Sequence, residues 1–181
     1  MITGNIGKHG KFRLWCNLGV TCFCEEPNNM DVSGSGVFRT ASSDIDNLTI
    51  EIMIPRGARV LYGVLGIRYL MSERGDIQDA RFKLDPDLLP GYEGGLIKNF
   101  DSVCYGLPEN YESAARYGFK RASLDSVKID LNRINIFFAA YGEVSSSERI
   151  FEKIGFVLAN LIVGKYDDRF KRKIAPLFEI D

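Results

Sequence analysis

The sequence predicts an α+β fold in which one sheet and a set of helices form two layers. Three observations support this fold class. Apolar and polar residues alternate over residues 48–54, and a turn and a second apolar run follow, which is typical of a β-hairpin. Two later segments, 108–122 and 145–162, repeat apolar residues every three or four positions, which is typical of helices. Alternation returns between these segments, so the second half follows the order strand, helix, strand, helix.

The length of the chain predicts a single domain. At 181 residues it is long enough to bury a core. We expect residues 1–47 to form an N-terminal β extension packed on the same domain, residues 48–164 to form the main domain, and residues 165–181 to form a basic tail or a helix end. Residues 26–46 are rich in Asn, Ser, Gly and Asp, which predicts a loop or a link.

Composition and charge limit the partners. No apolar run approaches the roughly 18 residues of a membrane span, and the N-terminus has no apolar stretch typical of a signal peptide. We therefore expect a cytoplasmic protein with no membrane partner. The net charge of −1 removes the bulk attraction to nucleic acid, so any RNA contact must be local. We interpret the basic cluster near the C-terminus as a solvated helix end: Lys165, Arg169, Lys171, Arg172 and Lys173.

The first expected strand covers residues 11–25 and carries three of the four cysteines. Every even position is apolar, namely Phe12, Leu14, Cys16, Leu18, Val20, Cys22 and Cys24. A period of two places these thiols on the buried face. The only histidine, His9, does not complete a zinc spacing with a Cys-x-Cys pair. We expect no metal and no cofactor.

The central hairpin is predicted from residues 48–70. Its first strand stops at Pro55-Arg56-Gly57, and the chain returns from Arg59 onward. Residues 72–95, which include Pro86 and Pro90, have the composition of irregular structure.

The first helix is expected to begin at Pro108, whose fixed φ and missing N–H suit a helix start. One apolar stripe follows, formed by Tyr111, Ala114, Ala115, Gly118, Phe119 and Ala122. A glycine inside a helix costs about 1 kcal/mol relative to alanine. We therefore expect Gly118 to mark a close contact between this helix and the sheet.

The next strand and helix complete the pattern. Val127, Ile129 and Leu131 alternate with polar residues, the phase slips at Asn132-Arg133, and alternation resumes from Ile134, which predicts a bulge. Ser145 and Glu148 have the spacing of a capping box, which would start the second helix. Its apolar stripe is Ile150, Phe151, Ile154, Val157, Leu158, Leu161 and Ile162.

Two motifs in this half resemble domain IV of elongation factor G. That family has Gly-(Val)-(Ile)-Pro-x-x-Tyr-x-x-Ala-x-x-x-Gly, and this chain keeps Gly106, Pro108, Tyr111, Ala114 and Gly118. The family also has Tyr-His-(Glu/Asp)-Val-Asp-Ser-Ser-Glu-x-x-Phe, and this chain has the run Tyr141-Gly142-Glu143-Val144-Ser145-Ser146-Ser147-Glu148 followed by Phe151. The resemblance covers residues 99–163 and extends toward Leu48, because Arg56-Gly57 and Tyr62-Gly63 are similar to the family's Gly-Gly-Arg-Gly-Gln-Tyr-Gly loop.

The resemblance implies a two-layer sandwich with a left-handed βαβ crossover, and a function in translation. In the factor, two loops at the tip of the domain enter the decoding region of the ribosome. The matching binding residues here would be Tyr141, Gly142, Glu143, Val144, Ser145, Arg56 and Arg59. Gly142 stands where the family has histidine, and Ser145 replaces an acid. The segment Gly4 to Lys11 lacks the spacing and the hydroxyl of a P-loop, so we expect no GTP hydrolysis.

The sequence leaves more than one function open. We expect a non-catalytic binding module that contacts the ribosome or structured RNA. The alternative is a single protein partner, with the chain acting as a protein-binding regulator or an immunity-type inhibitor. A ligand-binding or enzymatic member of the same broad fold is a third possibility. The serines Ser145, Ser146 and Ser147 could in principle pair with His9 as nucleophile and base, but helix capping is a sufficient reason for them.

Overall fold

The fold consists of one six-stranded sheet and two long helices. The computed structural model describes residues 1–16, 47–69, 95–97, 100–125, 130–163, 174–176 and 178. Its strands are β1 (Ile2–Ile6), β2 (Gly10–Cys16), β3 (Asn47–Arg56), β4 (Arg59–Tyr69), β5 (Val103–Tyr105) and β6 (Ile134–Gly142). Its long helices are α1 (Glu109–Asp125) and α2 (Glu148–Val163), and a short 3-10 helix, η2, spans Leu131–Arg133. The predicted α+β class is confirmed.

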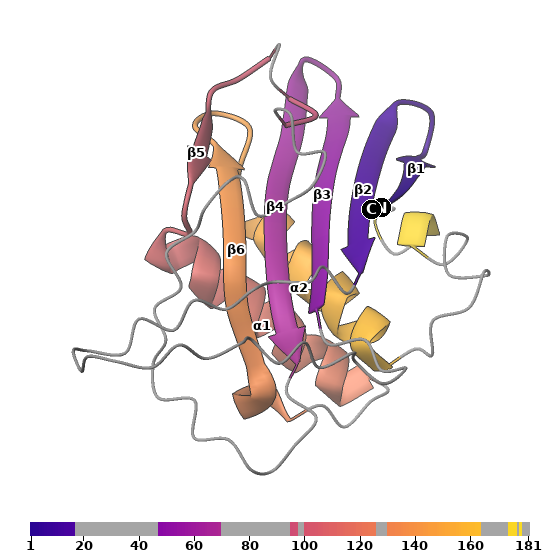
Figure 1. Cartoon of the computed structure of the whole chain (residues 1–181). Coiled ribbons are helices and arrows are strands. Elements are labelled where there is room, and N and C mark those ends of the chain that lie inside the picture. The colour runs from indigo at the N-terminus through magenta and orange to yellow at the C-terminus, as the bar shows by residue number, and fades with distance from the viewer. Residues whose placement is uncertain are drawn as a thin grey trace, which may run out of the picture.

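The strands lie in the order β1-β2-β3-β4-β6-β5, and each neighbouring pair is antiparallel (Figure 1). The predicted hairpin is present as β3 and β4. The resemblance implies a βαβ crossover, which requires two parallel strands. The strands on either side of α1 are β5 and β6, and they pair antiparallel with Val103 opposite Gly142. This pair therefore does not form the implied crossover.

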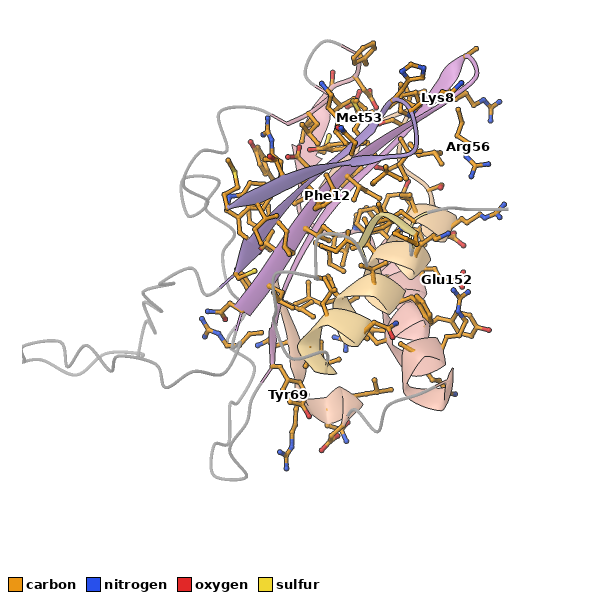
Figure 2. All side chains as sticks on the ribbon, turned by 90° about the vertical axis from the view of Figure 1, so that its right-hand side faces the viewer. Lys8, Phe12, Met53, Arg56, Tyr69 and Glu152 are labelled. Carbon is orange, nitrogen blue, oxygen red and sulfur yellow. The ribbon has the colours of Figure 1, made fainter. Side chains whose placement is uncertain are left out.

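Both helices cover the same face of the sheet (Figure 2). Their apolar stripes and the even positions of β3 form one buried cluster, which includes Ala115, Phe119, Ile154, Leu158 and Ile50. The helix that follows Pro108 is confirmed. An apolar stripe of this kind is stabilised mainly by burial, at roughly 25 cal/mol per Å² of apolar surface.

Gly118 has a different role from the one expected. A Cβ at Gly118 would meet the backbone of α2 at Glu152 and Phe156, and a Cβ at Gly155 would meet the backbone of α1 at Ala115. The expectation of a close helix–sheet contact is therefore wrong. The two glycines bring the backbones of α1 and α2 together.

The opposite face of the sheet is also buried. Trp15, Tyr62, Val64, Ile97 and Phe138 form a second apolar cluster there. Burial on both faces explains why every residue of β3 from Leu48 to Ile54 is buried, although alternation predicts a half-buried strand.

Part of the expected strand over 127–138, residues 127–129, lies outside the described residues, and the part that follows is a 3-10 turn and then a strand. Asp130 caps η2 by accepting a hydrogen bond from the Asn132 amide at 3.1 Å, and β6 starts only at Ile134. The slip in alternation at Asn132-Arg133 is therefore a helical turn and not a bulge. A register shift does occur in the β4–β6 pair, between Gly66 and Ile67.

Several predictions fall wholly or partly outside the described residues. They concern Cys22, Cys24, residues 26–46, residues 72–94 and the basic cluster at 165–173. In β2, Phe12 and Leu14 are buried as expected, and Cys16 is half-buried with a pKa raised by burial to about 11. Near the C-terminus, Ile174 and Phe178 are buried in the helix-side cluster. No helix in the described segments is long and apolar enough to cross a membrane.

Candidate functional site

The two predicted binding loops lie at the same end of the sheet (Figure 1). We call this end the tip and define it as the β3–β4 turn at 56–59 together with the β6–α2 connection at 142–147. Hydrogen bonds join the β6–α2 connection to β4 at Tyr62, three residues after Arg59. The Tyr62 amide donates to the Ser145 carbonyl at 3.0 Å, and the Ser146 hydroxyl donates to the Tyr62 carbonyl at 2.7 Å. The β6–α2 connection is therefore fixed to the strand that follows the β3–β4 turn.

Asp101 holds the β6–α2 connection in shape. Its Oδ2 atom accepts from the Ser145 hydroxyl at 2.6 Å, from the Ser145 amide at 2.9 Å and from the Val144 amide at 3.0 Å. Its Oδ1 atom accepts from the Ser102 amide at 2.8 Å. Partial burial raises the pKa of the Asp101 carboxyl, but these hydrogen bonds together lower it further, so the pKa lies below its ordinary value. Asp101 is therefore a charged acceptor that fixes the shape of the β6–α2 connection, and we call it the brace.

The brace explains why position 142 is a glycine. A Cβ on Gly142 would run into the Ser145 hydroxyl and the Asp101 carboxylate. The space that a histidine side chain would need is occupied by the Asp101–Ser145 hydrogen bond. The departure from the family motif is therefore coupled to the presence of Asp101.

The capping box expected at Ser145 is not formed. The helix α2 begins at Glu148, and the Ser147 carbonyl accepts from the amides of Ile150 at 3.1 Å and Phe151 at 3.3 Å. The Ser145 hydroxyl donates to Asp101, an acceptor that the local motif does not include. Ser147 is the residue that precedes the helix.

Tyr141 is an anchor of the tip. Its ring meets Tyr111 edge to face at 5.7 Å, and Tyr111 stacks on Phe151 at 4.9 Å. Repulsion from the neighbouring Cys104 sulfur is the largest cause that raises the pKa of Tyr141. Tyr111 belongs to the first of the two elongation factor motifs, and Tyr141 and Phe151 belong to the second. These ring contacts therefore bring the two motifs together and fix the end of β6 against both helices.

The outward surface of the tip combines cations with apolar side chains. Arg56 and Arg59 are exposed and lie opposite each other across the hairpin. Val144 is 88% exposed and Phe100 is 68% exposed. Glu143 is also exposed, and its Oε1 atom accepts from the Cys104 thiol at 3.7 Å. Such a surface suits contact with a large partner.

No protein-family model, curated protein or solved structure matches this chain. The segment Gly4 to Lys11 forms part of the β1–β2 hairpin, whereas a P-loop connects a strand to a helix. No three potential metal-binding side chains gather in the described segments.

Sequence reasoning did not identify Asp101 or Tyr62 as site residues. Asp101 acts on residues 43 and 44 positions away, and no local pattern marks such a contact. The sequence singles out Tyr62 only through its similarity to the elongation factor loop. Its backbone binds the β6–α2 connection, while its side chain is buried on the face of the sheet away from the helices.

Glu51 is a buried carboxylate beneath the tip that the Tyr62 side chain reaches. Its Oε1 atom accepts from the Tyr62 hydroxyl at 3.1 Å and from the Leu96 amide at 2.6 Å, and its Oε2 atom lies 3.4 Å from an Arg13 nitrogen. Burial raises the pKa of Glu51 more than the Leu96 amide, Arg13 and Tyr62 lower it.

Proposed function

We propose that this chain is a non-catalytic binding module that contacts the ribosome or another structured RNA through the tip. The observation that carries the proposal is the pair of hydrogen bonds that fix the β6–α2 connection, through Ser145 and Ser146, to β4 at Tyr62, three residues from the β3–β4 turn. These loops correspond to the two ribosome-contacting loops in the family that the sequence resembles, elongation factor G domain IV. The proposal places the protein in the cytoplasm.

The chemistry of the tip supports contact with the RNA backbone. Arg56 and Arg59 supply planar, permanently charged groups that suit phosphate oxygens. The amides of Val144 and Ser145 are already occupied by Asp101, so they do not serve as anion donors. Because Gly142 offers no side chain, the recognition that a histidine would provide is absent. The proposed mode is therefore binding by charge and shape.

Co-sedimentation with ribosomes at low and moderate salt tests this function. We expect the wild-type chain in the ribosomal pellet and a chain with Arg56→Gln and Arg59→Gln in the supernatant as salt rises, because two phosphate contacts are lost. A matched control changes Arg116→Gln and Lys120→Gln on α1, which removes the same charge from exposed positions away from the tip. Absence of the wild-type chain from the pellet at both salt levels would remove the proposal.

A protein-binding regulator or immunity-type inhibitor is the second candidate function. It is favoured by two exposed apolar side chains, Val144 at the tip and Phe100 next to Asp101. Aromatic side chains such as Phe100 are enriched in protein–protein interfaces. Affinity purification from the native host after ribonuclease treatment separates the two functions. A stoichiometric protein that is lost with Phe100→Ala and Val144→Ser supports the regulator, and recovery of none rejects it.

A further inference from the structure

We propose that the β1–β2 hairpin carries part of the RNA-binding surface, with Lys8 binding phosphate at the same end of the sheet as Arg56 and Arg59. This inference rests on the proposed function and extends it to the N-terminal segment, for which the elongation factor resemblance provides no counterpart. The partner is the phosphate backbone of a structured RNA.

The strand register places Lys8 and Arg56 at the same end of the sheet. The strands β2 and β3 pair antiparallel, and their last pair toward the tip is Lys11 opposite Met53. Lys8, in the β1–β2 turn, and Arg56, in β3, each lie three residues beyond that pair. The next strand of the sheet places Arg59 opposite Arg56. The two hairpins therefore present all three cations at one end of the sheet.

The figures agree with this placement. The turns of both hairpins lie at the same end of the sheet (Figure 1), and Lys8 and Arg56 lie at that end in the side view (Figure 2). The turns need glycine at Gly7 and Gly57, where φ is 58° in both cases. Two tight turns of this kind present their flanking basic side chains to solvent, and Lys8, Arg56 and Arg59 are all exposed.

Charge is concentrated on this part of the molecule. Residues 1–16 contain no aspartate or glutamate, and residues 47–69 contain only Glu51, which is fully buried beside Arg13. Lys8, Lys11 and Arg59 form no ion pair with any residue in the described segments. Of the cations in these two segments, Lys8, Arg56 and Arg59 lie at the tip end of the sheet, whereas Arg68 lies at the other end of the β3–β4 hairpin, opposite Asn47. The described parts of the two hairpins therefore expose cations and no carboxylate, although the chain has a net charge of −1.

The helix layer carries both signs near the tip. Glu109 and Glu112 lie in the first turn of α1, where Arg116 pairs with Glu112. Glu148 begins α2 and the exposed Arg149 follows it. The turns of the two hairpins, by contrast, expose cations without carboxylates, so a polyanionic partner is expected to contact the turns.

The experiment measures binding of a fluorescein-labelled RNA stem-loop by anisotropy between about 50 and 200 mM salt. The variants are Lys8→Gln, and Arg56→Gln with Arg59→Gln. The control is Arg116→Gln with Lys120→Gln. Each lost phosphate contact should reduce the salt slope by about one. For Lys8→Gln, the fall in affinity across this fourfold salt range should be about fourfold smaller than for the wild-type chain.

The outcomes separate the inference from the proposed function. If Lys8→Gln behaves as the wild-type chain while the arginine pair weakens binding, the hairpin inference is wrong and the proposed function stands. If the wild-type chain binds no RNA at any salt, both fail. A DNA duplex of the same sequence that competes equally well would overturn the assignment to RNA. Thermal unfolding with the same midpoint temperature as the wild-type chain verifies that each variant is folded.

Discussion

The Asp101 carboxylate and the Ser145 hydroxyl form a 2.6 Å hydrogen bond that closes the connection between β6 and α2. The same carboxylate oxygen accepts the amides of Val144 and Ser145. This arrangement fills the space beside Gly142, so no side chain can stand there. The shape of one tip loop therefore depends on a residue that lies outside that loop.

The first prediction concerns the strength of this brace. Asp101→Asn weakens four hydrogen bonds to a charged acceptor, and we expect a loss of about 1–2 kcal/mol in the free energy of unfolding. Ser145→Ala removes one of those bonds and should cost less. A double-mutant cycle by urea unfolding measures the coupling. Additive effects of the two substitutions would contradict a direct interaction.

The second prediction concerns acid. The pKa of Asp101 is lower in the folded protein than its ordinary value of 3.8, so the unfolded chain binds the proton more tightly. The stabilisation by Asp101 is therefore present above about pH 4 and is lost as pH falls through the lowered pKa. We expect the stability difference between wild type and Asp101→Asn to be constant near neutral pH and to shrink below pH 3.8. Urea unfolding at a series of acidic pH values measures this difference.

The local elements were predictable from the sequence, and the long-range polar contacts were not. Pro108 and the apolar stripe after it define α1 because helix formation follows local periodicity. Ser145 and Glu148 match a local capping motif, yet Asp101 takes the Ser145 hydroxyl from 44 positions away. Gly118 correctly indicates a close approach, but a glycine does not identify its partner, which is α2 and not the sheet.

The third prediction tests the coupling between Gly142 and the brace. Gly142→Ala should destabilise the protein by about 1–3 kcal/mol, because the new methyl group overlaps Ser145 and Asp101. In a Ser145→Gly background the same substitution should cost less, measured against Ser145→Gly alone, since one of the two obstructing groups is removed. Thermal unfolding of both single variants and the double variant measures the two costs. An equal cost of Gly142→Ala in both backgrounds would show that Ser145 does not limit the space.

The fourth prediction concerns the contact between α1 and α2. Alanine has the higher helix propensity, so Gly118→Ala would stabilise an isolated helix by about 1 kcal/mol. In this fold the added methyl group collides with the backbone of α2 at Glu152, and we expect a net loss of about 1–3 kcal/mol instead. Ser113→Ala, at an exposed position of α1, is the matched control and should be neutral or slightly stabilising. Denaturant unfolding distinguishes the two signs.

The last prediction concerns the buried carboxylate beneath the tip. The pKa of Glu51 is raised above 4.5 in the folded protein, so between pH 4.5 and that raised pKa the folded state binds more protons than the unfolded chain. The free energy of unfolding should therefore fall as pH rises through this window and become constant above it. Glu51→Gln removes this titration, so the variant should gain stability relative to wild type across the same window. Tyr62→Phe removes a hydrogen bond that lowers the pKa, so it should move the window to higher pH. Urea unfolding from pH 4.5 upward measures the free energy of unfolding of all three proteins. If the difference in this free energy between Glu51→Gln and wild type does not change with pH, Glu51 carries the same charge in the folded and unfolded states.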